Sequence, residues 1–375
     1  MAKYKLSDVA PIQQGSVQSS EKYWLLNLDM VESNTGRVLD YLYVSEDKIG
    51  SSTITFDTGN VLYSKLRPYL NKVVLPEQSG YATSEMLPMR PNQEIITREY
   101  LTYFLRSPRF VNYVNEKVTG AKMPRANIAD LKAVEVECPP IAEQKRISAL
   151  FDKTINLIGL RKEQLQQLEE LVKLRFQEMF GNHDLNNVQE DWKPISAIGT
   201  VVGGATPKTS VAEYWDGEYR WITPAELDNE AGYIFDSVRK LTELGVRSCS
   251  LKEMPIGTVI LSSRAPIGKV AIAGNTFYCN QGFKNIICNE EIHPMFLYTL
   301  LRMNTEYLIS LGRGATFKEI TKSIVENIRI PVPRKETQEK FATFVQKVDE
   351  LKFVVQKSID ETQLLFDSLM QMYFS

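Results

Sequence analysis

The chain has 375 residues, a formal net charge of −2, 43% hydrophobic residues and 24% charged residues. This length and composition are typical of a globular protein with two or three domains, each able to bury a core. No apolar run approaches the roughly 18 residues that a membrane span needs, so no membrane partner is expected. A free-standing nucleic-acid-binding protein usually carries a basic excess, so any DNA contact here must depend on local patches or on partner proteins.

Few residues are suited to metal or redox chemistry. The two histidines, His183 and His293, lie in different halves of the chain, so we expect no His-rich metal site. The four cysteines lie far apart and form no CxxC pair, which is typical of reduced thiols in a cytoplasmic protein. The N-terminus has no apolar segment of signal-peptide length. The cysteines are Cys138, Cys249, Cys279 and Cys288.

The chain contains an internal duplication with an interval of 194 residues. The positions repeated at this interval are Gly120, Pro139, Gln144 and Phe180, which recur as Gly314, Pro333, Gln338 and Phe374. Further upstream the match continues with small shifts. There Ser64, Arg67 and Lys72 correspond to Ser263, Arg264 and Lys269. A period this long indicates a duplicated domain, because solenoid repeats are far shorter.

Each copy begins with a mixed part. Short β-type runs between turn-forming residues predict strands at 41–44, 71–75, 258–261 and 269–272. Apolar residues at near-helical spacing predict helices over 99–114, interrupted by Pro108, and over 294–311. We therefore expect a curved, mostly antiparallel sheet with a few helices in each copy.

Each copy ends in a predicted long helix. Pro139 and Pro140 suit the first turn of one, and Gly181 suits the left-handed residue after its end. Apolar residues recur every seven positions with others between them, which predicts a coiled coil. The predicted core residues are Phe151, Ile158, Leu165, Leu168, Val172 and Met179 in the first helix and Val348, Val355, Ile359, Phe366 and Leu369 in the second. Further leucines, among them Leu157 and Leu174, are expected to broaden the apolar face.

Connectivity predicts how the long helices run. The second mixed part joins the C-terminal end of the first helix to the N-terminal end of the second, so the two helices can pair only antiparallel. The expected fold is therefore α+β, with two similar domains joined by an antiparallel coiled coil and related by an approximate two-fold axis. The expected boundaries are 1–138, 139–181, 182–332 and 333–375. A two-fold protein suits duplex DNA.

Catalytic motifs are missing from the sequence. Gly268-Lys269 lacks the further glycine and the Ser or Thr of a phosphate-binding loop, and no HExxH or GxSxG occurs. Carboxylates are scattered along solvated helices. An enzyme with an unrecognised active site is therefore a residual alternative.

Basic and polar loops occur at matching positions of the two copies. Arginine can pair with guanine edges and Asn or Gln with adenine edges, while Lys, Ser and backbone N–H groups hold phosphates. The alternative is that these are ordinary surface loops with solvated charges. The candidate DNA-binding residues are Tyr63, Ser64, Lys65, Arg67, Lys72, Lys122 and Arg125 in the first copy and Ser263, Arg264, Lys269, Asn280, Gln281, Lys284, Arg313, Thr316 and Lys318 in the second.

The helix-opening segment PPIAEQKRISALFDK at 139–153 resembles that of specificity subunits from type I restriction–modification systems. The segments 257–270, 314–318 and 328–332 resemble target-recognition domains of that family. The second copy keeps counterparts of Pro139 and Gln144 but not of Pro140 and Glu143. This departure questions the exact symmetry of the helix starts.

The resemblance implies a non-catalytic subunit for double-stranded DNA recognition. Each domain would read one half of a bipartite, asymmetric site, and the coiled coil would set the spacing and dock two methyltransferase subunits. Restriction subunits would complete an ATP-dependent nuclease. The chain itself would bind no cofactor, with S-adenosylmethionine, ATP and Mg²⁺ in the partner subunits. A duplicated protein-interaction scaffold without DNA binding is the competing hypothesis.

Overall fold

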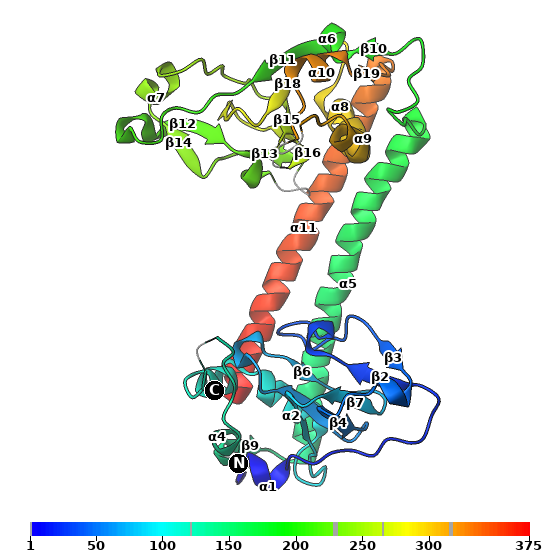
Figure 1. The fold of residues 1–375 in the computed structure, drawn as a ribbon, viewed down its shortest axis with the longest axis vertical. Coiled ribbons are helices and arrows are strands. Elements are labelled where there is room, and N and C mark those ends of the chain that lie inside the picture. Colours follow the sequence, from blue (N-terminus) through cyan, green and yellow to red (C-terminus); the bar gives the residue numbers. More distant parts are fainter. Residues whose placement is uncertain (1, 121, 228–231, 265, 315–317) are drawn as a thin grey trace. The chain divides into compact units, whose positions relative to one another are not determined.

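The computed structural model describes residues 2–120, 122–227, 232–264, 266–314 and 318–375. The chain forms two compact units. Unit 1 comprises Met1–Glu163 and Gln356–Ser375, and unit 2 comprises Gln164–Val355. Each unit contains strands, short helices and segments of both long helices (Figure 1).

Unit 1 contains sheets of four (β3-β2-β7-β4), three (β6-β5-β8) and two strands (β1-β9). Every strand pair in them is antiparallel except β2 with β7. The strands are β1 (Ala2–Lys5), β2 (Tyr23–Leu26), β3 (Leu42–Val44), β4 (Thr53–Phe56), β5 (Val61–Ser64), β6 (Val73–Val74), β7 (Gly80–Thr83), β8 (Met86–Met89) and β9 (Glu135–Cys138). The short helices are α1 (Leu6–Val9), α2 (Arg98–Arg106), α3 (Pro108–Asn115) and α4 (Ile128–Ala133).

Unit 2 contains sheets of five (β11-β18-β15-β16-β13), three (β14-β12-β17) and two strands (β10-β19). Two pairs, β12 with β17 and β13 with β16, are parallel. The strands are β10 (Lys193–Pro194), β11 (Gly199–Gly203), β12 (Trp215–Ile222), β13 (Tyr233–Ile234), β14 (Arg239–Leu241), β15 (Val259–Ser263), β16 (Ile267–Ala273), β17 (Tyr278–Cys279), β18 (Lys284–Cys288) and β19 (Arg329–Ile330). The short helices are α6 (Ile195–Ile198), α7 (Glu243–Arg247), α8 (Pro294–Met303), α9 (Thr305–Ser310) and α10 (Lys322–Asn327).

The predicted mixed α+β character and mostly antiparallel sheets are confirmed. The helix predicted over 99–114 is two helices, because Pro108 begins α3 and the Ser107 side chain caps it by accepting a hydrogen bond from the backbone N–H of Phe110. The helix predicted over 294–311 is likewise divided, at Asn304 between α8 and α9.

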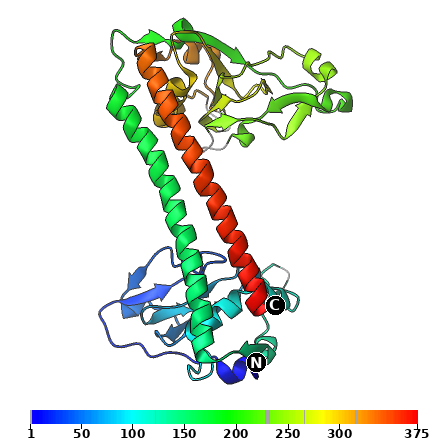
Figure 2. The ribbon, with the colours of Figure 1, turned by 180° about the vertical axis from the view of Figure 1, so that it is seen from behind.

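The long helices are α5 (Ile141–Phe180) and α11 (Lys335–Phe374). Gly181 follows α5 with φ +87°, as predicted for the left-handed residue after a helix. In unit 1, Arg146 donates to the Tyr373 hydroxyl and Arg161 donates to the Ser358 carbonyl. Residue numbers thus rise along one helix as they fall along the other, so the pair is antiparallel, as predicted (Figures 1 and 2).

The predicted seven-residue spacing corresponds to the buried side of this helix pair. Every predicted core residue in α5 and α11 is buried or half-buried. Polar side chains also pair on this side, since Arg161 donates to the Thr362 hydroxyl at 2.6 Å. Four of the further leucines, Leu157, Leu160, Leu171 and Leu174, are exposed, so this wider part of the apolar face is not buried within the protein.

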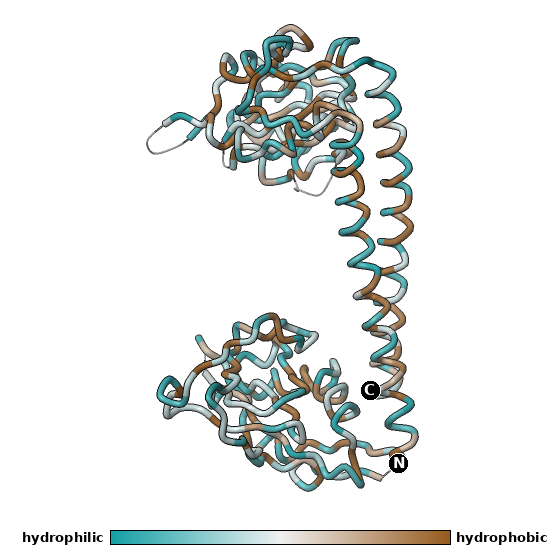
Figure 3. Tube along the Cα trace, turned by 90° about the vertical axis from the view of Figure 1, so that its right-hand side faces the viewer, coloured by the Kyte–Doolittle hydropathy of each residue, from teal (hydrophilic) through white to brown (hydrophobic). Residues whose placement is uncertain are grey.

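Aromatic side chains of the long helices complete the core of each unit. In unit 1, the Phe151 ring lies 4.7 Å from the Tyr103 ring and 5.9 Å from the Phe374 ring, between centroids. In unit 2, the Phe296 ring of α8 lies 4.8 Å from the Phe180 ring. Apolar residues accordingly recur within both units and along the long helices (Figure 3). The helices therefore belong to the cores and are not simple linkers.

Candidate nucleic-acid interface

Two loops of unit 1 meet at one surface. The segment after β5 contacts the segment before α4, because the backbone N–H of Arg67 donates to the Pro124 carbonyl at 2.7 Å. The N–H of Ala126 also donates to the Lys65 carbonyl at 2.8 Å. Both loops contain predicted DNA-binding residues, and the structure brings the two loops together.

Arg67 is the most exposed of the predicted residues in the first loop. It adopts a left-handed conformation, φ 50° and ψ 65°, ahead of the short 3-10 helix Pro68–Leu70. Side chains other than glycine rarely adopt this conformation, which often marks a functional position. Lys122 is also exposed, and Lys65 is half-buried. None of these three cations forms an ion pair with another residue that the structure describes.

Tyr69 and Met123 extend this surface and were not predicted from the sequence. Their exposed fractions are 52% and 45%. Tyr69 lies two residues after Arg67, and Met123 directly follows Lys122. Only their exposure distinguishes them from core residues, since neither residue type is polar enough to suggest a surface position.

Unit 2 places the corresponding predicted residues on two loops and a strand edge. Arg313, Lys318 and Gln281 are exposed, and Arg264 and Asn280 are half-buried. The Asn280 side chain accepts from the N–H of Gly282 at 2.8 Å, so its oxygen shapes its own turn. Thr316 lies outside the described residues.

Three predicted contact residues are buried, which corrects the prediction. Tyr63 is 2% exposed and packs edge-on against Phe110, while Ser64 and Ser263 are 2% and 0% exposed. The Ser64 hydroxyl donates to the Leu66 carbonyl within its own turn. These side chains support the loops and do not present atoms to a ligand.

The two lysines Lys72 and Lys269 are a further correction. The Lys72 ammonium donates to the Leu28 carbonyl at 2.6 Å, and the Lys269 ammonium donates to the Leu227 carbonyl at 2.7 Å. Burial lowers the pKa of Lys72, and the nearby Asp29 opposes that shift. Each lysine binds the backbone of a distant loop in the same way. The lysine therefore recurs in both copies because of its structural role.

The loop after β5 in unit 1 and the loop after β15 in unit 2 correspond to each other one residue away from the predicted match. The Lys65 carbonyl accepts from Ala126, and the Ser263 carbonyl accepts from Ile320. Ala126 and Ile320 are 194 positions apart. Lys65 is therefore the counterpart of Ser263, whereas the match predicted from the sequence was Ser64 with Ser263 and Arg67 with Arg264. That match was wrong because it aligned identical residue types, Ser with Ser and Arg with Arg, and not equivalent backbone positions.

Arg125 and Lys284 are engaged in ion pairs. Arg125 donates to Glu85 through Nε and Nη2, with the shortest distance 2.8 Å. Lys284 donates to Glu319 at 3.0 Å and to the Ser263 hydroxyl at 3.2 Å. Hydrogen bonds from Arg125 lower the pKa of Glu85, although burial opposes the shift. These cations are thus already neutralised within the protein.

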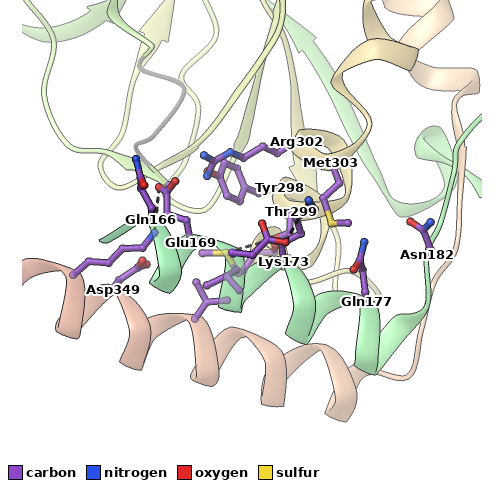
Figure 4. Close-up of a pocket in the computed structure, with 16 residues that line it drawn as sticks. Gln166, Glu169, Lys173, Gln177, Asn182, Tyr298, Thr299, Arg302, Met303 and Asp349 are labelled. Atoms are coloured by element: carbon purple, nitrogen blue, oxygen red, sulfur yellow. Dashed lines mark hydrogen bonds and ion pairs between the residues drawn. The ribbon is translucent and has the colours of Figure 1, made fainter. Parts of the chain in front are cut away.

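A hollow in unit 2 is the alternative candidate site (Figure 4). It has a volume of about 560 Å³ and lies between α5, α8 and α11. Two of its lysines form ion pairs, Lys352 with Glu169 at 3.5 Å and Lys173 with Glu170 at 3.6 Å, and Arg302 donates to the Tyr298 hydroxyl at 3.0 Å. Burial raises the pKa of Asp349, which Lys352 partly offsets. This arrangement contains no nucleophile hydrogen-bonded to a base among the lining residues.

Neither a metal centre nor a membrane segment is found in the part of the chain that the structure describes. Its His, Cys, Asp and Glu side chains form no group of three or more suited to a metal ion. None of its helices combines the length and apolar character that crossing a membrane requires.

Comparison with known proteins identifies both copies. The family model of the type I restriction modification DNA specificity domain matches residues 1–170 and 189–361. The chain is 44% identical over 186 residues to the type I restriction enzyme MjaIX specificity subunit of Methanocaldococcus jannaschii, covering 48% of this chain and 43% of that subunit. It is 25% identical over 330 residues to the putative MjaX specificity subunit of the same organism, covering 81% and 75%.

Solved structures support the same fold. One, described as the structural basis of complex assembly and conformational transition of the type I R-M system, has a TM-score of 0.67 at 19% identity, covering 100% of this chain and 97% of that one. The type I restriction–modification S subunit from M. genitalium has a TM-score of 0.59 at 15% identity, covering 100% and 96%. At these identities the likeness concerns the fold alone.

Proposed function

Because the chain belongs to the family of type I restriction–modification DNA specificity domains, we propose that it selects the DNA sequence at which a type I restriction–modification complex acts. Unit 1 and unit 2 each recognise one half of a bipartite, asymmetric site in double-stranded DNA. The observation that carries this proposal is the pair of exposed, basic loops that occurs in both units. The loops differ in sequence, so the two half-sites differ.

The side chains on these loops suit DNA. Arg67 and Arg313 are exposed guanidinium groups that can pair with guanine edges or hold phosphates, and Gln281 can pair with an adenine edge. Exposed lysines beside them, Lys122 and Lys318, add phosphate contacts. The net charge of −2 leaves much of the electrostatic attraction to partner subunits.

The long helices provide a docking surface and a spacer. Two methyltransferase subunits bind along them, and restriction subunits join in the full complex. Exposed apolar side chains on both helices support this role, because apolar groups gathered on a surface are typical of protein interfaces. They are Leu157, Leu160, Leu171, Leu174, Leu351, Phe353, Val354, Leu364, Leu365 and Met372.

The chain contributes recognition and not catalysis. S-adenosylmethionine, ATP and Mg²⁺ are bound by the partner subunits, which carry adenine methylation and ATP-dependent cleavage. The complex works in the cytoplasm, where the DNA is. A duplicated scaffold without DNA binding is the competing function, and it predicts complex formation that DNA does not change and no salt-sensitive affinity for DNA.

Two arginine substitutions test the proposal. Arg67→Ala and Arg313→Ala, assembled with the modification subunits, are expected to weaken recognition of one half-site each, by about 1–3 kcal/mol if the arginine reads a base. Sequencing of the methylated sites in cells measures this directly. The affected half-site should differ between the two variants.

Arg37→Ala and Arg247→Ala are the matched controls. Both arginines are exposed, one in each unit, and each pairs with a glutamate nearby in the sequence. They should leave the methylated sequence and its occupancy unchanged. Unchanged methylation in all four variants would show that other residues recognise the DNA.

A further inference from the structure

In both units an ion pair joins the same loop position to the neighbouring strand segment, with its charges exchanged. The strand-side members lie two residues apart in register, because the Glu85 carbonyl accepts from the N–H of Lys65, whereas the carbonyl that accepts from Ser263 belongs to Gly282, two residues before Lys284. In unit 1 the anion, Glu85, directly precedes β8 and the cation, Arg125, closes a loop. In unit 2 the cation, Lys284, begins β18 and the anion, Glu319, closes the loop. Arg125 and Glu319 are separated by 194 positions, the interval of the duplication.

The backbone around the loop-side member of each pair is the same. Thr119 and Arg125 exchange two hydrogen bonds, of 3.0 and 2.9 Å, and Arg313 and Glu319 exchange two of 3.1 and 3.0 Å. The next residue, Ala126 or Ile320, donates its N–H to the loop that follows β5 or β15. In each unit, therefore, the residue after the loop-closing one is attached by its backbone to one predicted DNA-binding loop, and the side chain of the loop-closing residue is attached to the strand-side partner.

The exposure of the four side chains explains why the two residues of each pair carry opposite charges. The strand-side member is the less exposed in both units: 21% for Glu85 against 42% for Arg125, and 12% for Lys284 against 38% for Glu319. A charge removed from water needs a partner of opposite sign. The charge of the less exposed, strand-side residue therefore determines which charge is favourable at the loop position.

We propose that Glu85–Arg125 and Lys284–Glu319 are ion pairs with the same loop-closing role, formed at the same loop position, and that Arg125 and Lys284 position the DNA-binding loops without contacting DNA. The reversed charge carries the argument. If the position of Arg125 held a phosphate in unit 1, its counterpart Glu319 would repel one in unit 2. The inference rests on the proposed function for its DNA-binding part, whereas the loop-closing part concerns the protein alone.

A charge-reversal cycle in unit 1 tests both parts. The variants are Arg125→Glu, Glu85→Arg and the double substitution. The first readout is cleavage after the exposed Lys122 by a lysine-specific protease, on the chain alone. The second is methylation through the half-site assigned to unit 1, in the complex with modification subunits.

Each single substitution places like charges together, so loop cleavage should rise and methylation should fall, each by about tenfold. The double substitution should restore both to within about threefold. Lys284→Glu, Glu319→Lys and their combination should repeat the pattern for the other half-site only. Arg67→Glu, a matched exposed control, should lower methylation without rescue by Glu85→Arg.

The outcomes separate the two parts of the inference. If cleavage is restored in the double variant but methylation is not, Arg125 contacts DNA and the positioning role is wrong. If cleavage is not restored, the ion pair does not close the loop. If cleavage follows the cycle while methylation never changes, unit 1 does not recognise DNA through these loops, and the proposed function fails there while the loop-closing pair stands.

The salt dependence of DNA affinity provides a second measurement, which a residue with a purely structural role does not change. Arg125→Ala should leave the slope of log affinity against log salt unchanged, whereas Lys122→Ala should reduce it by about one. A reduced slope for Arg125→Ala would overturn the positioning role.

Discussion

At the scale of single residues, Arg67 has both a strained backbone conformation and an exposed side chain. Its left-handed conformation is held by its own N–H, which bonds Pro124, and by its carbonyl, which accepts from Leu70. Such a conformation costs an L-residue roughly 1–2 kcal/mol, and glycine would avoid that cost. An arginine at a position that suits glycine is expected where its side chain is needed.

Two substitutions of Arg67 should differ in the stability of the protein but not in DNA recognition. Arg67→Gly is expected to be more stable than Arg67→Ala by about 1 kcal/mol, because only glycine adopts this φ without strain. Both variants should lose recognition of the same half-site equally. Urea unfolding and methylated-site sequencing measure the two effects. Equal stability of the two variants would mean that the position stores no strain.

At the scale of elements, one glutamine fixes the start of each long helix. The Gln144 amide accepts from the N–H of Thr97 and donates to the Ile95 and Pro139 carbonyls, at 2.7 to 2.8 Å. Gln338 makes the same three bonds, accepting from His293 and donating to Glu291 and Pro333. Both glutamines are 0% exposed. Each joins the start of a long helix to the residue that caps α2 or α8.

Removing either amide should destabilise only its own unit. Gln144→Ala leaves buried backbone groups without partners, each costing about 1–3 kcal/mol, so hydrogen exchange in α2 should accelerate by 30-fold or more, on the order of 2 kcal/mol. Gln338→Ala should have the same effect in α8. Gln371→Ala, an exposed glutamine on α11, is the control and should change neither. Acceleration in both units from one substitution would contradict this local role.

The elements could be predicted where the sequence pattern is local. The seven-residue spacing predicted the buried side of α5 and α11, and Gly181 predicted where α5 ends. Pro139 and Pro140, which were predicted to lie in its first turn, directly precede its first residue, Ile141. The repeated Gln144 marked an important position, but its bonds to residues 47 and 49 positions away depend on the fold. For the same reason Lys72 and Arg125 were predicted to bind DNA, since their partners Leu28 and Glu85 are 44 and 40 positions away.

At the scale of the whole molecule, the duplication keeps the scaffold and varies the exposed side chains. The glutamine bonds, the lysine bonds to distant loops and the loop-closing hydrogen bonds recur in both units, whereas Arg67, Tyr69 and Lys122 have no identical counterparts. This distribution suits two similar domains with different targets. Both long helices contribute to both units, so a change in helix length affects both together.

Lengthening both helices should therefore change the gap between half-sites and leave the half-sites alone. Because Arg161 contacts Ser358 and Thr362, an insertion after Gly159 in α5 is matched by one after Asp360 in α11. Seven residues in each preserve the apolar spacing and add about 10 Å. At roughly 3.4 Å per base pair, the gap should grow by about three base pairs. Methylated-site sequencing measures the gap and the half-sites together. The same insertion in α5 alone displaces one helix against the other and should impair recognition without defining a new gap. A changed half-site sequence with an unchanged gap would exclude the helices as the spacer.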